Sequence, residues 1–116
     1  MTMLPGYPSG NGQAKWQEIK SRELSALLAQ ATIPPVLLDV RASYEYSQGH
    51  IPGAIHIPLS SLPHALASLD PARAYVIVCY SGSRARRAAA LLAGHGLNQV
   101  GVLLGGMDAW EGPTTR

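Results

Sequence analysis

Cysteine is scarce in this chain, because Cys79 is the only cysteine among 116 residues. A single cysteine excludes an intramolecular disulfide, a Cys-x-x-Cys redox pair and a cysteine-rich structural zinc site. The histidines also lack the His-Glu-x-x-His spacing of a metal-binding helix, so we expect no metal. They are His50, His56, His64 and His95.

Long apolar runs and strong charge are missing as well. No apolar run approaches the roughly 20 residues that span a bilayer, and residues 1–13 lack the basic start and apolar stretch of a signal peptide. We therefore expect a cytoplasmic protein without membrane contact. The formal net charge of +2 is too small to indicate nucleic acid as a partner.

What the chain does contain is enough apolar material for one folded domain, since 47% of its residues are hydrophobic. Residues 1–14 are rich in proline and glycine, and we interpret them as a flexible N-terminal arm. Residues 15–116 are interpreted as the single domain.

Strand-like and helix-like segments alternate along that domain. Ser21 is the expected cap of the first helix, and the prolines at 34 and 35 are expected to stop it. Strands are predicted at 16–19, 36–39, 54–57, 74–78 and 100–104, and helices after Ser21, over 43–48, in the second half of 60–69 and over 84–93. The alternation predicts an α/β fold with a mostly parallel sheet and helices on both faces.

Cys79 follows the clearest of these strands and precedes a loop of small residues and a helix start. Ligands of open parallel sheets bind beyond the carboxyl ends of the strands, where Cys79 and Asp39 both lie. The backbone N–H groups of such a loop favour an anion, so we expect a thiolate with a lowered pKa that acts as a nucleophile. Arg84, Arg86 and Arg87 follow at once and are expected to concentrate small anions there.

Four segments in this order resemble a rhodanese-like domain, the single-domain type of sulfurtransferase. The resemblance covers roughly residues 16–113 and implies a central parallel sheet of five strands. The segments are Leu37-Leu38-Asp39-Val40-Arg41; Glu45-Tyr46 with Gly49-His50-Ile51-Pro52-Gly53-Ala54; Val78-Cys79-Tyr80-Ser81-Gly82-Ser83-Arg84-Ala85; and Gly105-Gly106 with Trp110.

The resemblance also implies the chemistry. The Cys79 thiolate would take the outer sulfur of a small anionic donor such as thiosulfate and pass it to cyanide or a thiol. A protein could serve as donor or acceptor instead, and no cofactor is needed. In this chain Tyr80 directly follows the cysteine, where many such enzymes carry Arg or Lys, which bears on whether thiosulfate is the donor.

Roles carried over by the resemblance fall on the loop and on one neighbouring strand end. Backbone N–H groups of the loop would stabilise the thiolate and the persulfide, and Gly82 would permit the turn. Arg84 would hold the loop or the sulfonate of thiosulfate, while Asp39 and Arg41 would brace the surrounding loops. The loop residues are Tyr80, Ser81, Gly82, Ser83 and Arg84.

Two other readings of the same residues stay open. A phosphatase or arsenate reductase of the same fold uses a Cys-x5-Arg loop, one residue longer than the Cys-x4-Arg spacing from Cys79 to Arg84. A non-enzymatic sulfur-carrier or regulatory binding module is the other alternative, against which the cysteine and its intact loop argue.

Overall fold

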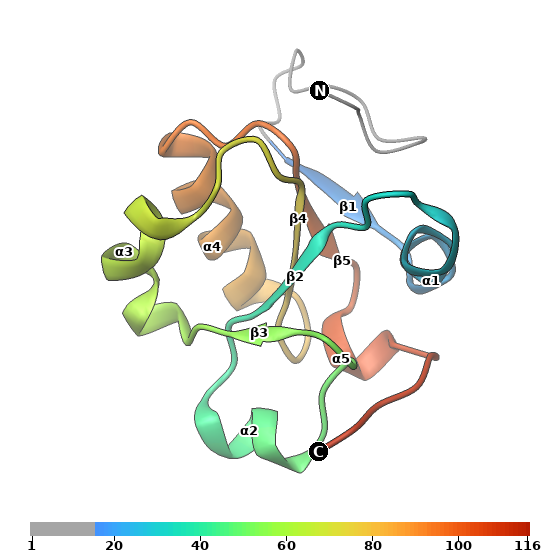
Figure 1. Ribbon diagram of the computed structural model, residues 1–116. Helices are drawn as coiled ribbons and strands as arrows, with labels where there is room; N and C mark the ends of the chain where they lie inside the picture. Colours follow the sequence, from blue (N-terminus) through green and yellow to red (C-terminus); the bar gives the residue numbers. More distant parts are fainter. Residues whose placement is uncertain (1–15) are drawn as a thin grey trace.

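The computed structural model describes residues 16–116, so the arm predicted over residues 1–14 lies outside the described part of the chain. Five parallel strands form one sheet, as expected, and their order is β1-β5-β4-β2-β3 (Figure 1). The strands are β1 (Gln17–Ile19), β2 (Val36–Asp39), β3 (Ile55–His56), β4 (Tyr75–Val78) and β5 (Val100–Leu103).

Helical segments connect these strands. The longer ones are α1 (Ser21–Gln30), α2 (Ser43–Gln48) and α4 (Ser83–Gly94). The shorter ones are the 3₁₀ turn η1 (Leu59–Ser61), α3 (Leu62–Ala65), the 3₁₀ turn η2 (Leu66–Ser68) and α5 (Gly106–Ala109). Within residues 16–116, no helix is long and apolar enough to cross a membrane.

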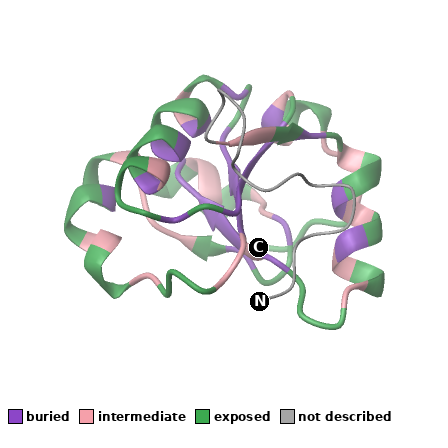
Figure 2. Ribbon diagram, turned by 90° about the horizontal axis from the view of Figure 1, so that it is seen from above, coloured by how far each residue is buried: buried purple, intermediate pink, exposed green. Residues whose placement is uncertain are grey.

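The two faces of the sheet carry separate apolar clusters, because side chains alternate along each strand. On one face, Tyr75 and Ile77 of β4 pack with the buried alanines of α4 and with Leu62 of α3. On the other face, Val76 and Val78 pack with α1 and with the α5 region. Figure 2 shows the result as a buried sheet between helices whose outer surfaces are exposed. Helices therefore cover both faces, as expected.

The central strand β4 is buried along its whole length, which explains its uninterrupted run of apolar residues. Its register pairs Asp39 of β2 with Val78. The carboxyl ends of β2 and β4 thus lie side by side at the lower end of the molecule in Figure 1, next to α2. Asp39 and Cys79 are brought to the same edge of the sheet by this register.

The structure differs from the sequence-based expectation in three local details. Ser21 is the first residue of α1 rather than its cap: the cap is Lys20, whose N–H donates to the Glu23 carboxylate at 2.9 Å. Strand β3 has only two residues, Ile55 and His56. The region 59–68 is helical throughout, but it is broken into two 3₁₀ turns around one α-helical turn.

Candidate active site

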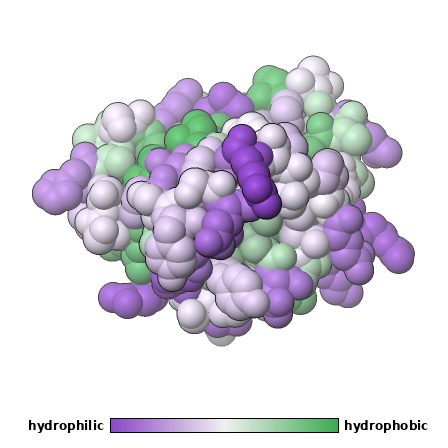
Figure 3. Space-filling model, turned by 90° about the horizontal axis from the view of Figure 1, so that it is seen from below, coloured by the Kyte–Doolittle hydropathy of each residue, from purple (hydrophilic) through white to green (hydrophobic). Residues whose placement is uncertain are grey.

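The side chain of Cys79 lies at the carboxyl end of the central strand, and the residue is only 1% exposed. Its Sγ accepts the backbone N–H of Gly82 at 2.8 Å, so the loop folds back over the sulfur. Gly82 caps α4 with φ of +112°, a conformation that favours glycine. Figure 3 looks onto this end of the molecule, where hydrophilic and hydrophobic side chains are interspersed.

The short helix α5 supports the loop from the other side. The N–H of Met107 donates to the carbonyl of Cys79 at 2.8 Å, and the N–H of Asp108 donates to the carbonyl of Tyr80 at 2.9 Å. Because C=O and N–H point in opposite directions across a trans peptide, the N–H groups of Tyr80 and Ser81 point away from α5. The backbone that follows Cys79 is therefore fixed, with its carbonyls turned to α5.

Gly106 lets α5 approach this closely. Its φ is +59°, and a Cβ atom at this position would overlap the carbonyl oxygens of both Cys79 and Tyr80. Steric contact with the cysteine loop therefore explains why glycine occupies position 106 in the Gly105-Gly106 pair.

Arg84 closes the loop by pairing with a carboxylate from α2. Its guanidinium donates to both oxygens of Glu45, at 2.7 and 3.0 Å, in a two-pronged ion pair. These hydrogen bonds lower the pKa of Glu45 to about 2, although partial burial opposes the shift. The same bonds raise the pKa of Arg84, and the charge of nearby Cys79 adds a smaller contribution.

Asp39 and Arg41 form a second, fully buried pair at the end of β2. The Arg41 guanidinium donates to Asp39 Oδ2 at 2.7 Å and to the carbonyl of Gly49 at 2.8 Å. The backbone N–H of Arg41 also donates to Asp39 Oδ1 at 3.0 Å. This pair ties the chain that leaves β2 to the end of α2, so it fixes the helix that carries Glu45.

An aromatic stack completes the support of α2. The ring of Tyr46 lies between those of His50 and His56, with centroid distances of 3.7 and 4.5 Å. Tyr46 Oη donates to the carbonyl of Ala54, and a ring nitrogen of His56 is 2.8 Å from the carbonyl of Arg41. In this arrangement both histidines are structural. Among residues 16–116, no group of three or more His, Cys, Asp or Glu side chains is placed to hold a metal ion.

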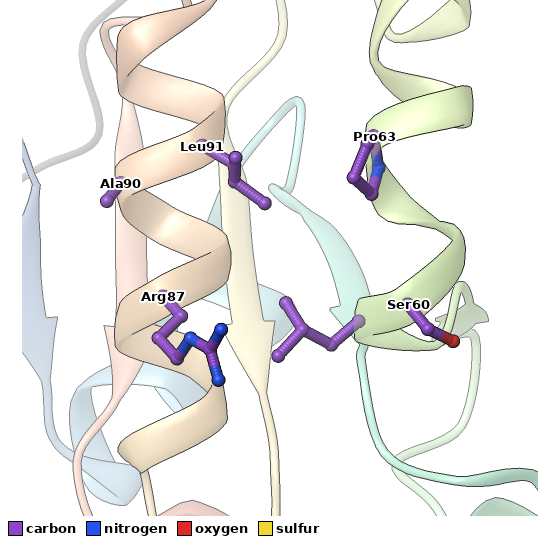
Figure 4. A pocket seen from close by; sticks show the side chains of 6 residues that line it. Ser60, Pro63, Arg87, Ala90 and Leu91 are labelled. Atoms are coloured by element: carbon purple, nitrogen blue, oxygen red, sulfur yellow. The ribbon is translucent and has the colours of Figure 1, made fainter.

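The three arginines that follow the cysteine are directed to three different neighbours, and their effect on the local concentration of anions stays a prediction. Arg84 pairs with Glu45, and Arg86 lies 3.6 Å from a carboxylate oxygen of Glu18 on β1. Arg87 points into a groove between α4 and the η1–α3 segment (Figure 4). That groove has a volume of about 850 Å³ and is lined by Leu59, Ser60, Pro63, Arg87, Ala90 and Leu91.

Most of the site residues predicted from the sequence are drawn together by these contacts. Cys79, residues 80–84 and the Asp39–Arg41 pair all lie at the carboxyl end of β2 and β4. Sequence reasoning gave no role to Glu45 or Asp108. Glu45 lies in one of the four segments that resemble the family, and a carboxylate there is a candidate ion-pair partner for Arg84. Asp108 carried no recognisable signal.

A parallel α/β sheet with one cysteine in a tight loop beyond its central strand defines a recognisable class of protein. The family model for the rhodanese-like domain matches residues 21–113 of this chain. The chain therefore belongs to the rhodanese-like domain family.

Individual relatives agree with this assignment. A sulfurtransferase from Allochromatium vinosum is 39% identical over 93 residues, which cover 80% of this chain and 86% of the relative. The thiosulfate sulfurtransferase GlpE from Pseudomonas savastanoi is 32% identical and covers 84% and 89% of the two chains. The crystal structure of SSP1007 from Staphylococcus saprophyticus superimposes with a TM-score of 0.79 at 31% identity, covering 86% of this chain and 99% of that one.

Proposed function

We propose that this protein is a sulfurtransferase in which Cys79 carries the sulfur as a persulfide. The observation that carries the proposal is the hydrogen bond from the Gly82 N–H to Cys79 Sγ, inside a loop that α5 holds rigid. The names of the relatives support the same reaction class.

The proposed reaction has two displacements at sulfur. The Cys79 thiolate attacks the outer sulfur of the donor, the donor's S–S bond breaks, and its remainder leaves with the bonding electron pair. With thiosulfate the products are the Cys79 persulfide anion and sulfite. The acceptor then attacks the outer sulfur of the persulfide: cyanide gives thiocyanate and regenerates the thiolate. No cofactor takes part in either step.

The loop stabilises the charged sulfur in both states. The N–H of Gly82 and the start of α4 offer positive partial charge to the thiolate. The same groups would stabilise the negative charge of a persulfide on Cys79. The exposed hydroxyls of Ser81 and Ser83 are further donors at the rim. The guanidinium of Arg84 is paired with Glu45, so we assign Arg84 the role of positioning the loop.

Asp39 and Arg41 act one step further away, since their pair fixes the chain between β2 and α2. We assign them a positioning role rather than contact with the substrate.

The phosphatase alternative is disfavoured by the loop. Phosphate binding in such a loop needs a guanidinium free to receive it, whereas Arg84 makes two hydrogen bonds to Glu45. The spacing from Cys79 to Arg84 is also one residue shorter than Cys-x5-Arg. The other alternative is a sulfur carrier, which would accept sulfur on Cys79 but would not pass it to cyanide repeatedly. The experiment below distinguishes the two by measuring how often thiocyanate forms.

The test is mass spectrometry of the purified protein after incubation with a sulfur donor, followed by addition of cyanide. We expect a gain of one sulfur on Cys79, its loss with cyanide, and repeated formation of thiocyanate. Cys79→Ala should gain no sulfur and form no thiocyanate. Sulfur transfer by that variant would overturn the assignment of the nucleophile, and loading without repeated turnover would indicate a carrier. Cell fractionation checks the expected cytoplasmic location.

A further inference from the structure

Two stretches that cover the same face of the sheet carry no charged side chain. Residues 58–69, which include η1, α3 and η2, contain no Asp, Glu, Lys or Arg, and neither do residues 88–98, which include most of α4. The outer face of a helix on a globular protein usually carries charged or polar side chains. The second half of α4 instead exposes Ala90 and Leu91. This part of the surface is therefore an apolar helix face without a partner among residues 16–116.

The groove of about 850 Å³ lies between these two stretches. Leu91 of α4 and Pro63 of α3 point toward one another across it, and Arg87 lies one helical turn before Leu91 (Figure 4). Arg87 is the only formally charged residue of its lining. Within residues 16–116 no carboxylate forms an ion pair with Arg87, in contrast to Arg84 and Arg86. The groove thus combines apolar walls with one cation that lacks a counter-charge.

The groove also lies on the face of the sheet to which the cysteine belongs. Cys79 is part of the buried cluster that Leu62 of α3 and Ala88 of α4 complete. The N–H of Leu59 donates to the carbonyl of Val40 at 3.1 Å, and the N–H of Val40 donates to the carbonyl of Val78 at 2.9 Å. One wall of the groove therefore begins two hydrogen bonds away from the strand that ends before Cys79, and α4, the other wall, begins directly after the cysteine loop.

The shape of the groove favours a helix over a small molecule. All lining residues except Leu59 are exposed, so the groove would cover an occupant on one side only, whereas small-molecule sites bury most of their ligand. The backbone N–H groups of α4 are bonded within the helix, so this wall offers an extended peptide no sheet edge to pair with. A helix satisfies its own backbone and needs only side-chain contact on one face, as in the helix-in-groove mode of recognition.

We propose that this groove is the docking site of a protein partner, which inserts an amphipathic helix with an apolar face and a carboxylate that pairs with Arg87. The apolar face covers Leu91 and Pro63, and the carboxylate supplies the counter-charge that Arg87 lacks within residues 16–116. The inference goes beyond the proposed function, because binding in the groove requires no step at sulfur.

The experiment uses a helical peptide of about 16 residues as the probe. Its leucines occupy positions i, i+3, i+4 and i+7, and glutamates flank this face; a basic peptide has lysine in place of each glutamate. Fluorescence anisotropy measures the dissociation constant, and amide chemical shifts in NMR spectra locate the binding. We expect the acidic peptide to bind with a Kd below about 0.1 mM, to shift amides of residues 59–63 and 87–91, and to bind more tightly than the basic peptide.

A charge swap tests the role of Arg87. Arg87→Glu should weaken binding of the acidic peptide by about tenfold and strengthen binding of the basic peptide. Arg22→Glu is the matched control: it makes the same change of charge at an exposed position of α1, which covers the other face of the sheet. It should leave both dissociation constants nearly unchanged.

A second pair of variants tests the apolar wall. Leu91→Gln should weaken the acidic peptide by about fivefold, because a 37% exposed leucine loses its apolar contact with the peptide. Ile33→Gln is the control, since Ile33 is exposed in the segment that precedes β2. Both substituted positions lie on the surface, so folding should be preserved, and circular dichroism checks it.

Four results would overturn the inference. They are no binding of the acidic peptide up to 1 mM, amide shifts outside the groove, equal effects of Arg87→Glu and Arg22→Glu, and binding of decanoate but not of the peptide, which would make the groove a site for small amphiphiles. Sedimentation of the protein alone excludes or reveals a second copy as the occupant, and self-association that Leu91→Gln abolishes would also overturn it. All of these measurements are made without a sulfur donor, so they fail or succeed independently of sulfur loading on Cys79.

Discussion

At the scale of single residues, Gly106 decides how closely α5 can approach the cysteine loop. Its backbone lies against the carbonyls of Cys79 and Tyr80, and its φ of +59° belongs to the left-handed region. Two separate costs therefore face any side chain at this position: steric overlap with the loop and backbone strain.

Gly106→Ala should lower the free energy of unfolding by at least about 1–3 kcal/mol and reduce sulfur loading of Cys79. Urea unfolding and mass spectrometry measure the two effects. Gly94→Ala is the matched control, because no atom lies within 4 Å of its Cβ and Gly94 is the last residue of α4. We expect this control to be neutral or slightly stabilising. Equal effects of the two substitutions would show that Gly106 has no special role.

At the scale of secondary-structure elements, the ion pair between Glu45 and Arg84 joins α2 to the start of α4. These residues are 39 positions apart in the sequence, and the pair is partly buried. The pair ties the helix that follows β2 to the helix that follows the cysteine loop, so its loss should loosen the site as well as the fold.

This pair predicts a specific dependence of stability on pH. Folding lowers the pKa of Glu45 from 4.5 to about 2, so the carboxylate contributes its full stabilisation above about pH 4.5. That contribution is lost as the pH falls through about 2 and Glu45 becomes protonated in the folded state. The free energy of unfolding of the wild-type protein should therefore fall between pH 4.5 and 2.

Glu45→Gln should remove that part of the pH dependence and cost about 1–2 kcal/mol at pH 7, since Arg84 remains about a third exposed. The measurement is urea unfolding at a series of pH values. Glu111→Gln serves as control, because Glu111 is exposed and makes no ion pair within the described residues 16–116. A wild-type slope that Glu45→Gln leaves unaltered would contradict the assignment.

Strands and the main helices could be predicted from the sequence because their signals are local. The buried run of β4 and the apolar face of α4, formed by Ala85, Ala88 and Ala89, follow from spacing alone. The contact between Glu45 and Arg84 is not local, so only a fold could place these residues together. The prediction that Ser21 caps α1 was wrong for a related reason. The Ser21 hydroxyl accepts a hydrogen bond from the N–H of Glu111, 90 residues away in the sequence.

At the scale of the whole molecule, the chain after α5 returns to the α2 region. Thr115 and His50 form two backbone hydrogen bonds of 2.9 Å in an antiparallel bridge. Figure 1 shows the C-terminus beside α2 at the lower end of the molecule. The bridge holds the end of the helix that carries Glu45, so residues near position 115 are linked to the site through α2.

Thr115→Pro removes the N–H donor of this bridge, and Thr115→Ala keeps it. We expect Thr115→Pro to lower the free energy of unfolding by about 1 kcal/mol and to speed hydrogen exchange at the His50 amide. Thr115→Ala should change neither by a comparable amount. Identical behaviour of the two variants would mean that the bridge does not stabilise α2.

The support of the loop by α5 also has a consequence for protein synthesis. Met107 and Asp108 supply the N–H groups that fix the carbonyls of Cys79 and Tyr80, and they are made more than two dozen residues after the cysteine. A ribosome-bound chain that has released Cys79 but not yet α5 carries the thiol without its clamp. The complete support for the loop can therefore form only after α5 has left the ribosome, so the nascent thiol emerges before the helix that holds its loop.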